Sequence, residues 1–128
     1  MALGSPRVLI ADDEPQLLQV LVRALERGGC SVVTANDGVE AVSAFRAAPD
    51  EISAVVIDAA IGPHGAAHVL TTVAKERPRL NVVITSGDQL SDSLRSLLIA
   101  HNGIFLRKPF PPSALLDAVK DSLTEEDA

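Results

Sequence analysis

Residues 8–14 read VLIADDE, an apolar run that stops abruptly on three acidic side chains. Later apolar runs of the chain also stop on polar residues, which are Asp58, then Thr85 and Ser86, then Arg107 and Lys108. Because the strands of a parallel sheet point the same way, the polar residues that follow them meet at one edge of the sheet. The sequence therefore predicts a site of carboxylates, a hydroxyl and an amine drawn from distant segments.

The chain alternates strand-like and helix-like segments. Apolar, β-branched runs are predicted as strands at about residues 7–11, 31–34, 54–57, 81–86 and 104–106. Each is followed by apolar residues at helical spacing, and the fourth helix is predicted to carry Leu90, Leu94, Leu97 and Leu98. Five strands alternating with five helices predict a doubly wound parallel α/β sheet, in a single domain over residues 1–128 with its core at about 7–123.

Composition narrows the classes of protein that this chain can represent. With 128 residues and 47% apolar content, the chain is large enough to bury one core. The formal net charge of −6 argues against direct binding to nucleic acid. No apolar run approaches the roughly 20 residues that span a bilayer, and the first residues lack a secretion signal. The single Cys30, predicted to be a reduced core residue, also favours a cytoplasmic location.

The carboxylates of Asp12, Asp13 and Asp58 are the central feature of the predicted site. Carboxylates held so close repel one another, so they usually accompany a cation, and oxygen ligands of this kind suit Mg²⁺. An aspartate on a rigid strand end beside Mg²⁺ can attack phosphorus and carry a phosphoryl group, a role available to Asp58. Lys108 offers a positive charge to a phosphate oxygen, and Ser86 offers a hydrogen bond.

Each of these residues also has an ordinary structural explanation. Acidic residues before a helix complement its dipole, and most lysines are simply exposed to solvent. A cis peptide bond at Lys108–Pro109 would aim the amine inward, although trans is the commoner state of such bonds. His64, His68 and His101 show no metal-ligand spacing and are predicted to be surface residues.

Taken together, the strand ends resemble the receiver domain of two-component response regulators, the family that includes the chemotaxis regulator. The matching motifs are VLIADDE at 8–14, VVID at 55–58, VVITSG at 82–87 and FLRKPF at 105–110. They occur in the family's order, and the resemblance covers about residues 7–123. It implies a flavodoxin-like sheet with strand order 2-1-3-4-5, in a bacterial, cytoplasmic signalling protein that is not an enzyme.

The resemblance also implies a role for each residue of the site. Asp58 would accept a phosphoryl group from a phosphohistidine of a sensor histidine kinase or phosphotransfer protein. Lys108 would pair with the phosphoryl oxygens. Asp58 and Asp13 would bind Mg²⁺ directly and Asp12 through water, with the backbone carbonyl of Ala60 as a further ligand.

Two further residues correspond to the family's switch. The hydroxyl residue is usually followed by Ala or Gly, so it maps to Ser86 and less well to Thr85. The aromatic residue three positions before the lysine is Phe105, which has no hydroxyl group. Phosphorylation would then alter the face made by the fourth helix, fifth strand and fifth helix. That face would contact a downstream protein target or an output domain, and a homodimer is a further option.

The stretch after Asp58 departs from the family pattern. The family usually has Met-Pro or Leu-Pro three and four residues after the aspartate, where this chain has Ile61 and Gly62. The family's glycine comes eight residues after the aspartate, whereas Gly65 comes at seven. The loop is therefore one residue shorter, which bears on its backbone geometry and on Ala60 as a metal ligand.

Three alternative interpretations share parts of this pattern. A phosphatase of the haloacid dehalogenase type also uses a strand-end aspartate, but it needs a second Asp two residues on, where Ala60 stands. A receiver-like domain that has lost phosphorylation and binds its partner constitutively would fit the shortened loop. A flavodoxin-type FMN module shares the topology but needs a phosphate cradle that the first loop lacks. The sequence leaves open whether the chain acts alone or is part of a longer regulator or hybrid kinase.

Overall fold

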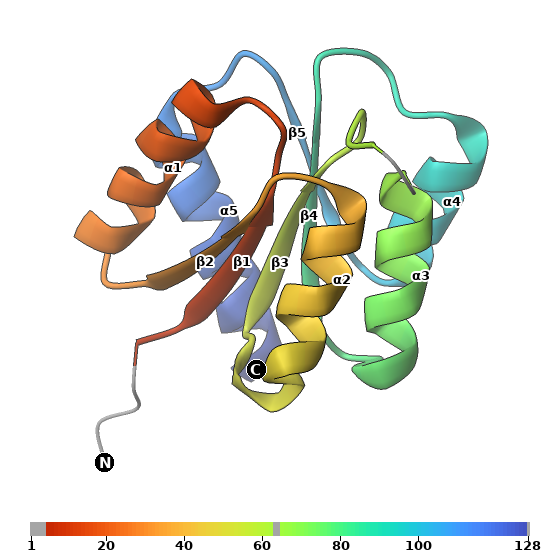
Figure 1. Ribbon diagram of the computed structural model, residues 1–128, viewed down its shortest axis with the longest axis horizontal. Coiled ribbons are helices and arrows are strands. Elements are labelled where there is room, and N and C mark those ends of the chain that lie inside the picture. The colour runs from red at the N-terminus through yellow and green to blue at the C-terminus, as the bar shows by residue number, and fades with distance from the viewer. Residues whose placement is uncertain (1–4, 63–64, 128) are drawn as a thin grey trace.

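Five parallel strands form the sheet in the computed structural model, which describes residues 5–62 and 65–127. The strand order is β2-β1-β3-β4-β5, as the resemblance implied, and helices cover both faces (Figure 1). The strands are β1 Arg7–Ala11, β2 Ser31–Ala35, β3 Ala54–Asp58, β4 Asn81–Ser86 and β5 Ile104–Arg107. The helices are α1 Pro15–Arg27, α2 Gly38–Ala47, α3 Ala66–Glu76, α4 Asp92–Ala100 and α5 Pro112–Asp127, with a short 3-10 helix at Pro49–Glu51.

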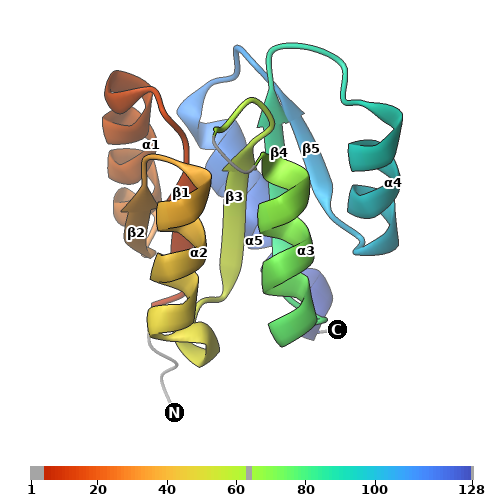
Figure 2. The same cartoon turned by 45° about the vertical axis from the view of Figure 1, so that its right-hand side comes forward.

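Two apolar cores lie on opposite faces of the sheet. Alternate strand residues such as Val8 and Val56 pack under α1 and α5, whereas Leu9 and Val55 pack under α2, α3 and α4. Figure 2 shows these two helical layers on either side of the sheet. All five residues of β3 are buried, as expected for a central strand covered on both faces. The sheet therefore holds its strand ends rigidly.

The helix starts follow from the local sequence. Pro15 occupies the first turn of α1, where its missing N–H is not needed. Asp37 caps α2, because its side chain accepts the N–H of Glu40 at 2.7 Å, and the Glu40 carboxylate accepts the N–H of Asn36 at 2.9 Å. Cys30 is buried, as predicted. No helix among the described residues has the length and apolar character needed to cross a membrane.

The boundaries of two helices differ from those predicted. Leu90 does not belong to the fourth helix, because Ser91 caps α4 and the helix begins at Asp92. Leu90 is nevertheless buried in the core under α4. The last helix continues to Asp127, beyond the predicted limit of the core at about residue 123, since no glycine or proline interrupts that stretch.

In the turn after α4, formed by Asn102 and Gly103, the left-handed residue is not the glycine. Asn102, and not Gly103, adopts the left-handed conformation, with φ of 54°. Gly103 is required for another reason, because a Cβ at this position would collide with the side chain of Leu98. Close packing of the turn under α4 therefore sets the start of β5.

Candidate functional site

The carboxyl ends of β1 and β3 bring three aspartates together. Asp12 follows β1 and Asp58 ends β3, and both residues are buried, with exposed fractions of 2% and 4%. Asp13 is exposed beside Asp12 in the connection to α1. One carboxylate oxygen from each of the three lies within 4.8 Å of the others. The structure thus brings together the three carboxylates that were predicted to meet from their positions at strand ends.

Backbone groups hold Asp12 in place. Its N–H donates to the Ala35 carbonyl at 3.1 Å, and its Oδ1 accepts the N–H of Glu14 at 2.9 Å. Burial raises the pKa of Asp12, and the Glu14 N–H and the Lys108 ammonium offset this effect only in part. Ionising Asp12 therefore costs more free energy in the folded protein than in the unfolded chain, and additional positive charge nearby would lower that cost.

Lys108 reaches the cluster from the end of β5. Its Nζ lies 3.1 Å from Asp12 Oδ2, 2.9 Å from Glu14 Oε1 and 3.1 Å from Asp58 Oδ1. The Lys108–Pro109 peptide bond is cis, the less common of the two states that the sequence allowed. Burial by itself lowers the pKa of Lys108, but hydrogen bonds to the three carboxylates outweigh it and raise the pKa. The amine is therefore a fixed positive charge at neutral pH.

Glu14 is the one member of the site for which the sequence predicted no role. Its signal in the sequence is its position directly after the acidic pair. The contact with Lys108 joins residues 94 positions apart, so only the folded chain reveals it. The site consequently holds four carboxylates, and three of them, from Asp12, Glu14 and Asp58, contact the Lys108 ammonium.

Two hydroxyls lie at the end of β4 and make different contacts. Thr85 stands beside Asp58 in the sheet register, and its Oγ1 donates to Asp58 Oδ1 at 3.4 Å. The Oγ of Ser86 accepts the N–H of Asp88 at 3.0 Å, and its carbonyl accepts the Lys108 N–H at 2.8 Å. Successive side chains of a strand point to opposite faces, so the hydroxyl that reaches Asp58 here is that of Thr85.

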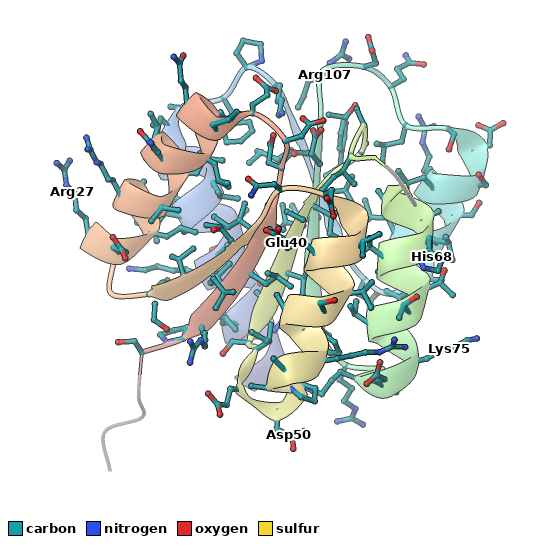
Figure 3. All side chains as sticks on the ribbon, viewed as in Figure 1. Arg27, Glu40, Asp50, His68, Lys75 and Arg107 are labelled. Carbon is teal, nitrogen blue, oxygen red and sulfur yellow. The ribbon has the colours of Figure 1, made fainter. Side chains whose placement is uncertain are left out.

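The donor set fits a hard divalent cation. The aspartate oxygens of the cluster are the ligand type that Mg²⁺ prefers, and their mutual repulsion favours a cation between them. Within residues 5–62 and 65–123, no other group of three acidic, histidine or cysteine side chains has this spacing. His68 is exposed on α3 (Figure 3), as predicted, whereas His101 is half-buried where α4 ends. His64 lies outside the described residues.

The sequence matches a known family over most of its length. A family model described as "Response regulator receiver domain" matches residues 8–120. The chain belongs to the response regulator receiver domain family. It is therefore a signalling domain of the two-component type, and the acidic cluster fits the phosphorylation site of such domains.

Curated relatives of this receiver domain include regulators and a kinase. The chain is 33% identical over 109 residues to the probable transcriptional regulatory protein TcrX of Mycobacterium tuberculosis, covering 84% of the chain and 45% of TcrX. It is 31% identical over 124 residues to the sensor kinase CckA of Brucella abortus, covering 97% of the chain and 13% of CckA. The receiver domain thus spans less than half the length of either relative.

Solved receiver structures share the fold. A receiver domain protein from Clostridium thermocellum superposes with a TM-score of 0.82 at 26% identity, covering 95% of this chain and 97% of that one. A CheY-like receiver from Methanospirillum hungatei gives 0.86 at 22% identity, covering 97% and 98%. The second likeness is evidence for the fold alone.

In this receiver domain, residues 61 and 62, which follow Asp58 in the connection to α3, are held by backbone hydrogen bonds. The N–H of Ile61 donates to the Asp58 carbonyl at 3.1 Å, and the Ile61 side chain is buried in the core under α2 and α3. The Gly62 carbonyl accepts the N–H of Gly38, the first residue of α2, at 3.3 Å. Ala60 is exposed in the turn between Asp58 and Ile61. Residues 63 and 64 lie outside the described part of the chain.

The remaining predicted residue, Phe105, lies within β5, three residues before Lys108. It stands on the edge strand β5 with 39% of its surface exposed. Arg107 lies at the end of the same strand, at the sheet edge that carries the carboxylates (Figure 3). β5 therefore connects the exposed Phe105 to Lys108 through only a few residues of strand.

Proposed function

We propose that this receiver domain accepts a phosphoryl group on Asp58 from a phosphohistidine of a sensor histidine kinase or phosphotransfer protein. The observation that supports this most strongly is the buried Asp58 carboxylate with Lys108 Nζ 3.1 Å away. A carboxylate on a rigid strand end is positioned before its reaction partner arrives, which lowers the barrier to attack. Membership of the receiver family supports the same role.

Asp12, Asp13 and Asp58 would hold the Mg²⁺ ion, with the backbone carbonyl of Ala60 as a further ligand. The spacing of the three carboxylates and the cost of ionising the buried Asp12 support this assignment. When bound, the ion supplies positive charge that stabilises the phosphoryl oxygens during transfer.

In the transfer step, a carboxylate oxygen of Asp58 bonds to phosphorus while the bond from phosphorus to the imidazole nitrogen breaks. The electron pair of the broken bond stays on the imidazole nitrogen, and the product is an aspartyl phosphate. Lys108 remains protonated and donates an N–H to a phosphoryl oxygen, where charge accumulates in the transition state.

The proposed switch couples this site to the face made by α4, β5 and α5. The phosphoryl group adds about −2 of charge and three acceptor oxygens, and Ser86 would turn its hydroxyl toward them. Phe105 would move inward from its exposed position into the space that Ser86 vacates. The hydrogen bond from the Lys108 N–H to the Ser86 carbonyl supports coupling between the two strand ends. The change shifts a population between two states and creates no new fold.

The domain at residues 1–128 would act as a cytoplasmic signalling module and would catalyse at most its own phosphorylation and dephosphorylation. The altered face would contact a downstream protein target or an output domain, and a homodimer through α4 and α5 is consistent with this. The net charge of −6 speaks against direct contact with nucleic acid.

The experiment that tests the proposal measures intact mass after incubation with Mg²⁺ and acetyl phosphate. We expect a gain of one phosphoryl group that is lost in Asp58→Asn. If the wild-type protein gains none while a known receiver is labelled, the result contradicts the proposal and favours a constitutive binding module.

A further inference from the structure

Glu14 makes the shortest of the three contacts to Lys108. Its Oε1 lies 2.9 Å from Lys108 Nζ, against 3.1 Å for the oxygens of Asp12 and Asp58. Glu14 also occupies the N-cap of α1, yet its side chain makes no capping hydrogen bond to that helix. The carboxylate is therefore engaged with the lysine and not with the helix to which the residue belongs.

An ammonium group has three N–H bonds, and three carboxylates surround this one. A phosphoryl oxygen can bind Lys108 only if one of these carboxylates gives way. The side chains of Asp12 and Asp58 are 3% and 6% exposed, whereas that of Glu14 is 59% exposed. Releasing Glu14 costs least, because its carboxylate regains contact with water as it leaves.

Resting on the function proposed above, we propose that Glu14 is a positioning residue that occupies Lys108 before phosphorylation and competes with the incoming phosphoryl group for it. When Asp58 accepts a phosphoryl group, a phosphoryl oxygen then replaces the Glu14 carboxylate as the partner of Lys108. Without Glu14, Lys108 remains held by Asp12 and Asp58, so the amine keeps its place while its competitor is gone. Glu14 therefore slows acceptance, and it restrains phosphorylation by small phosphodonors.

The test compares labelling rates with acetyl phosphate at saturating Mg²⁺ in the wild-type protein, Glu14→Gln and Glu26→Gln. Glu26 is exposed on α1 away from Lys108, so its variant controls for the loss of one negative charge. We expect Glu14→Gln to be labelled about 1.5- to 5-fold faster, the size of one exposed ion-pair contact, and Glu26→Gln to match wild type. If Glu14→Gln is labelled at the wild-type rate or more slowly, Glu14 does not compete with the phosphoryl group for Lys108, and the proposal is wrong.

A second measurement does not depend on the variant. The side-chain carboxyl ¹³C resonance of Glu14 in wild-type protein is followed while Mg²⁺ and beryllofluoride, a phosphoryl mimic, are added. We expect the resonance to move toward that of a solvated glutamate, and an unchanged resonance in a protein that binds the mimic contradicts the exchange. A wild-type protein that acetyl phosphate does not label refutes the function proposed above, which separates that failure from this one.

Discussion

Lys108 Nζ lies 3.1 Å from Asp58 Oδ1, although the two residues come from the ends of strands that β4 separates. The distance is short because the extended lysine side chain reaches past the end of the intervening strand β4, and the carboxylates at the sheet edge attract it. The proposed nucleophile and its positive partner are thus in place before any phosphodonor binds.

Replacing Lys108 with methionine should slow phosphorylation of Asp58. The variant keeps most of the side-chain volume but removes the only ammonium near the carboxylates in the described structure. We expect the labelling rate with acetyl phosphate to fall by about 100-fold or more, the usual effect of losing one charge-stabilising donor. Lys75→Met is the matched control, because Lys75 extends from α3 into solvent (Figure 3). Equal rates for Lys108→Met and wild type would remove Lys108 from the transfer step.

The two hydroxyls at the end of β4 can be separated by substitution. We expect Ser86→Ala to be labelled but to lose most of the change at Phe105, measured as shifts of the phenylalanine ring resonances when beryllofluoride and Mg²⁺ are added. Thr85→Val should retain that change and be labelled only a few-fold more slowly, because its hydroxyl contacts Asp58 in the resting state through one long hydrogen bond. If Thr85→Val loses the change at Phe105 and Ser86→Ala retains it, the switch hydroxyl is that of Thr85.

The fold was predictable from the sequence because its strands are apolar runs with clear ends. The order of the elements, the cap at Asp37 and the burial of Cys30 all follow from local pattern. The start of α4 was predicted too early, since Leu90 fits a helical spacing while being buried from an irregular segment. Apolar residues at helical spacing indicate which side chains are buried, but a buried residue such as Leu90 need not belong to the helix.

The site was predictable in its composition but not in its contacts. The strand ends placed the aspartates and Lys108 together, because parallel strands share one carboxyl edge. Glu14 could not be assigned, since its partner depends on where a long lysine side chain ends. The choice between Thr85 and Ser86 depends on which face each one takes in the register with Asp58, and a single sequence does not specify that register.

Mg²⁺ should stabilise the folded protein. The ion binds a site that the unfolded chain lacks, so the free energy of unfolding should rise by about 2.7 kcal/mol when Mg²⁺ reaches 100 times its dissociation constant. Urea unfolding with and without EDTA measures the effect. Asp13→Asn should lose most of it, whereas Asp50→Asn, at the opposite end of the molecule (Figure 3), should retain it. Equal Mg²⁺ stabilisation in both variants would place the ion elsewhere.

The buried Asp12 should make stability fall as pH rises, when no divalent cation is present. Its pKa is raised above 3.8 by burial, so the folded state holds this proton more tightly than the unfolded state does. The contribution is therefore lost as pH rises from about 4 through the folded pKa. The raised pKa of Lys108 contributes a constant stabilisation in this window, because both states are protonated below its usual value of 10.5.

We therefore expect Asp12→Asn to be more stable than wild type at pH 7 in EDTA, and the difference to shrink toward pH 4. Urea unfolding of both proteins across this range measures it. A difference that stays constant with pH, or a variant that is less stable at pH 7, would show that ionised Asp12 is not a cost to the fold.

The most direct test of the central claim is the intact mass of the protein after incubation with acetyl phosphate. Three samples are compared, which are wild type with Mg²⁺, wild type with EDTA, and Asp58→Asn with Mg²⁺. A phosphoryl-accepting receiver gains one phosphoryl group in the first sample only. Absence of the gain in the first sample, or an equal gain in Asp58→Asn, would contradict phosphorylation at Asp58.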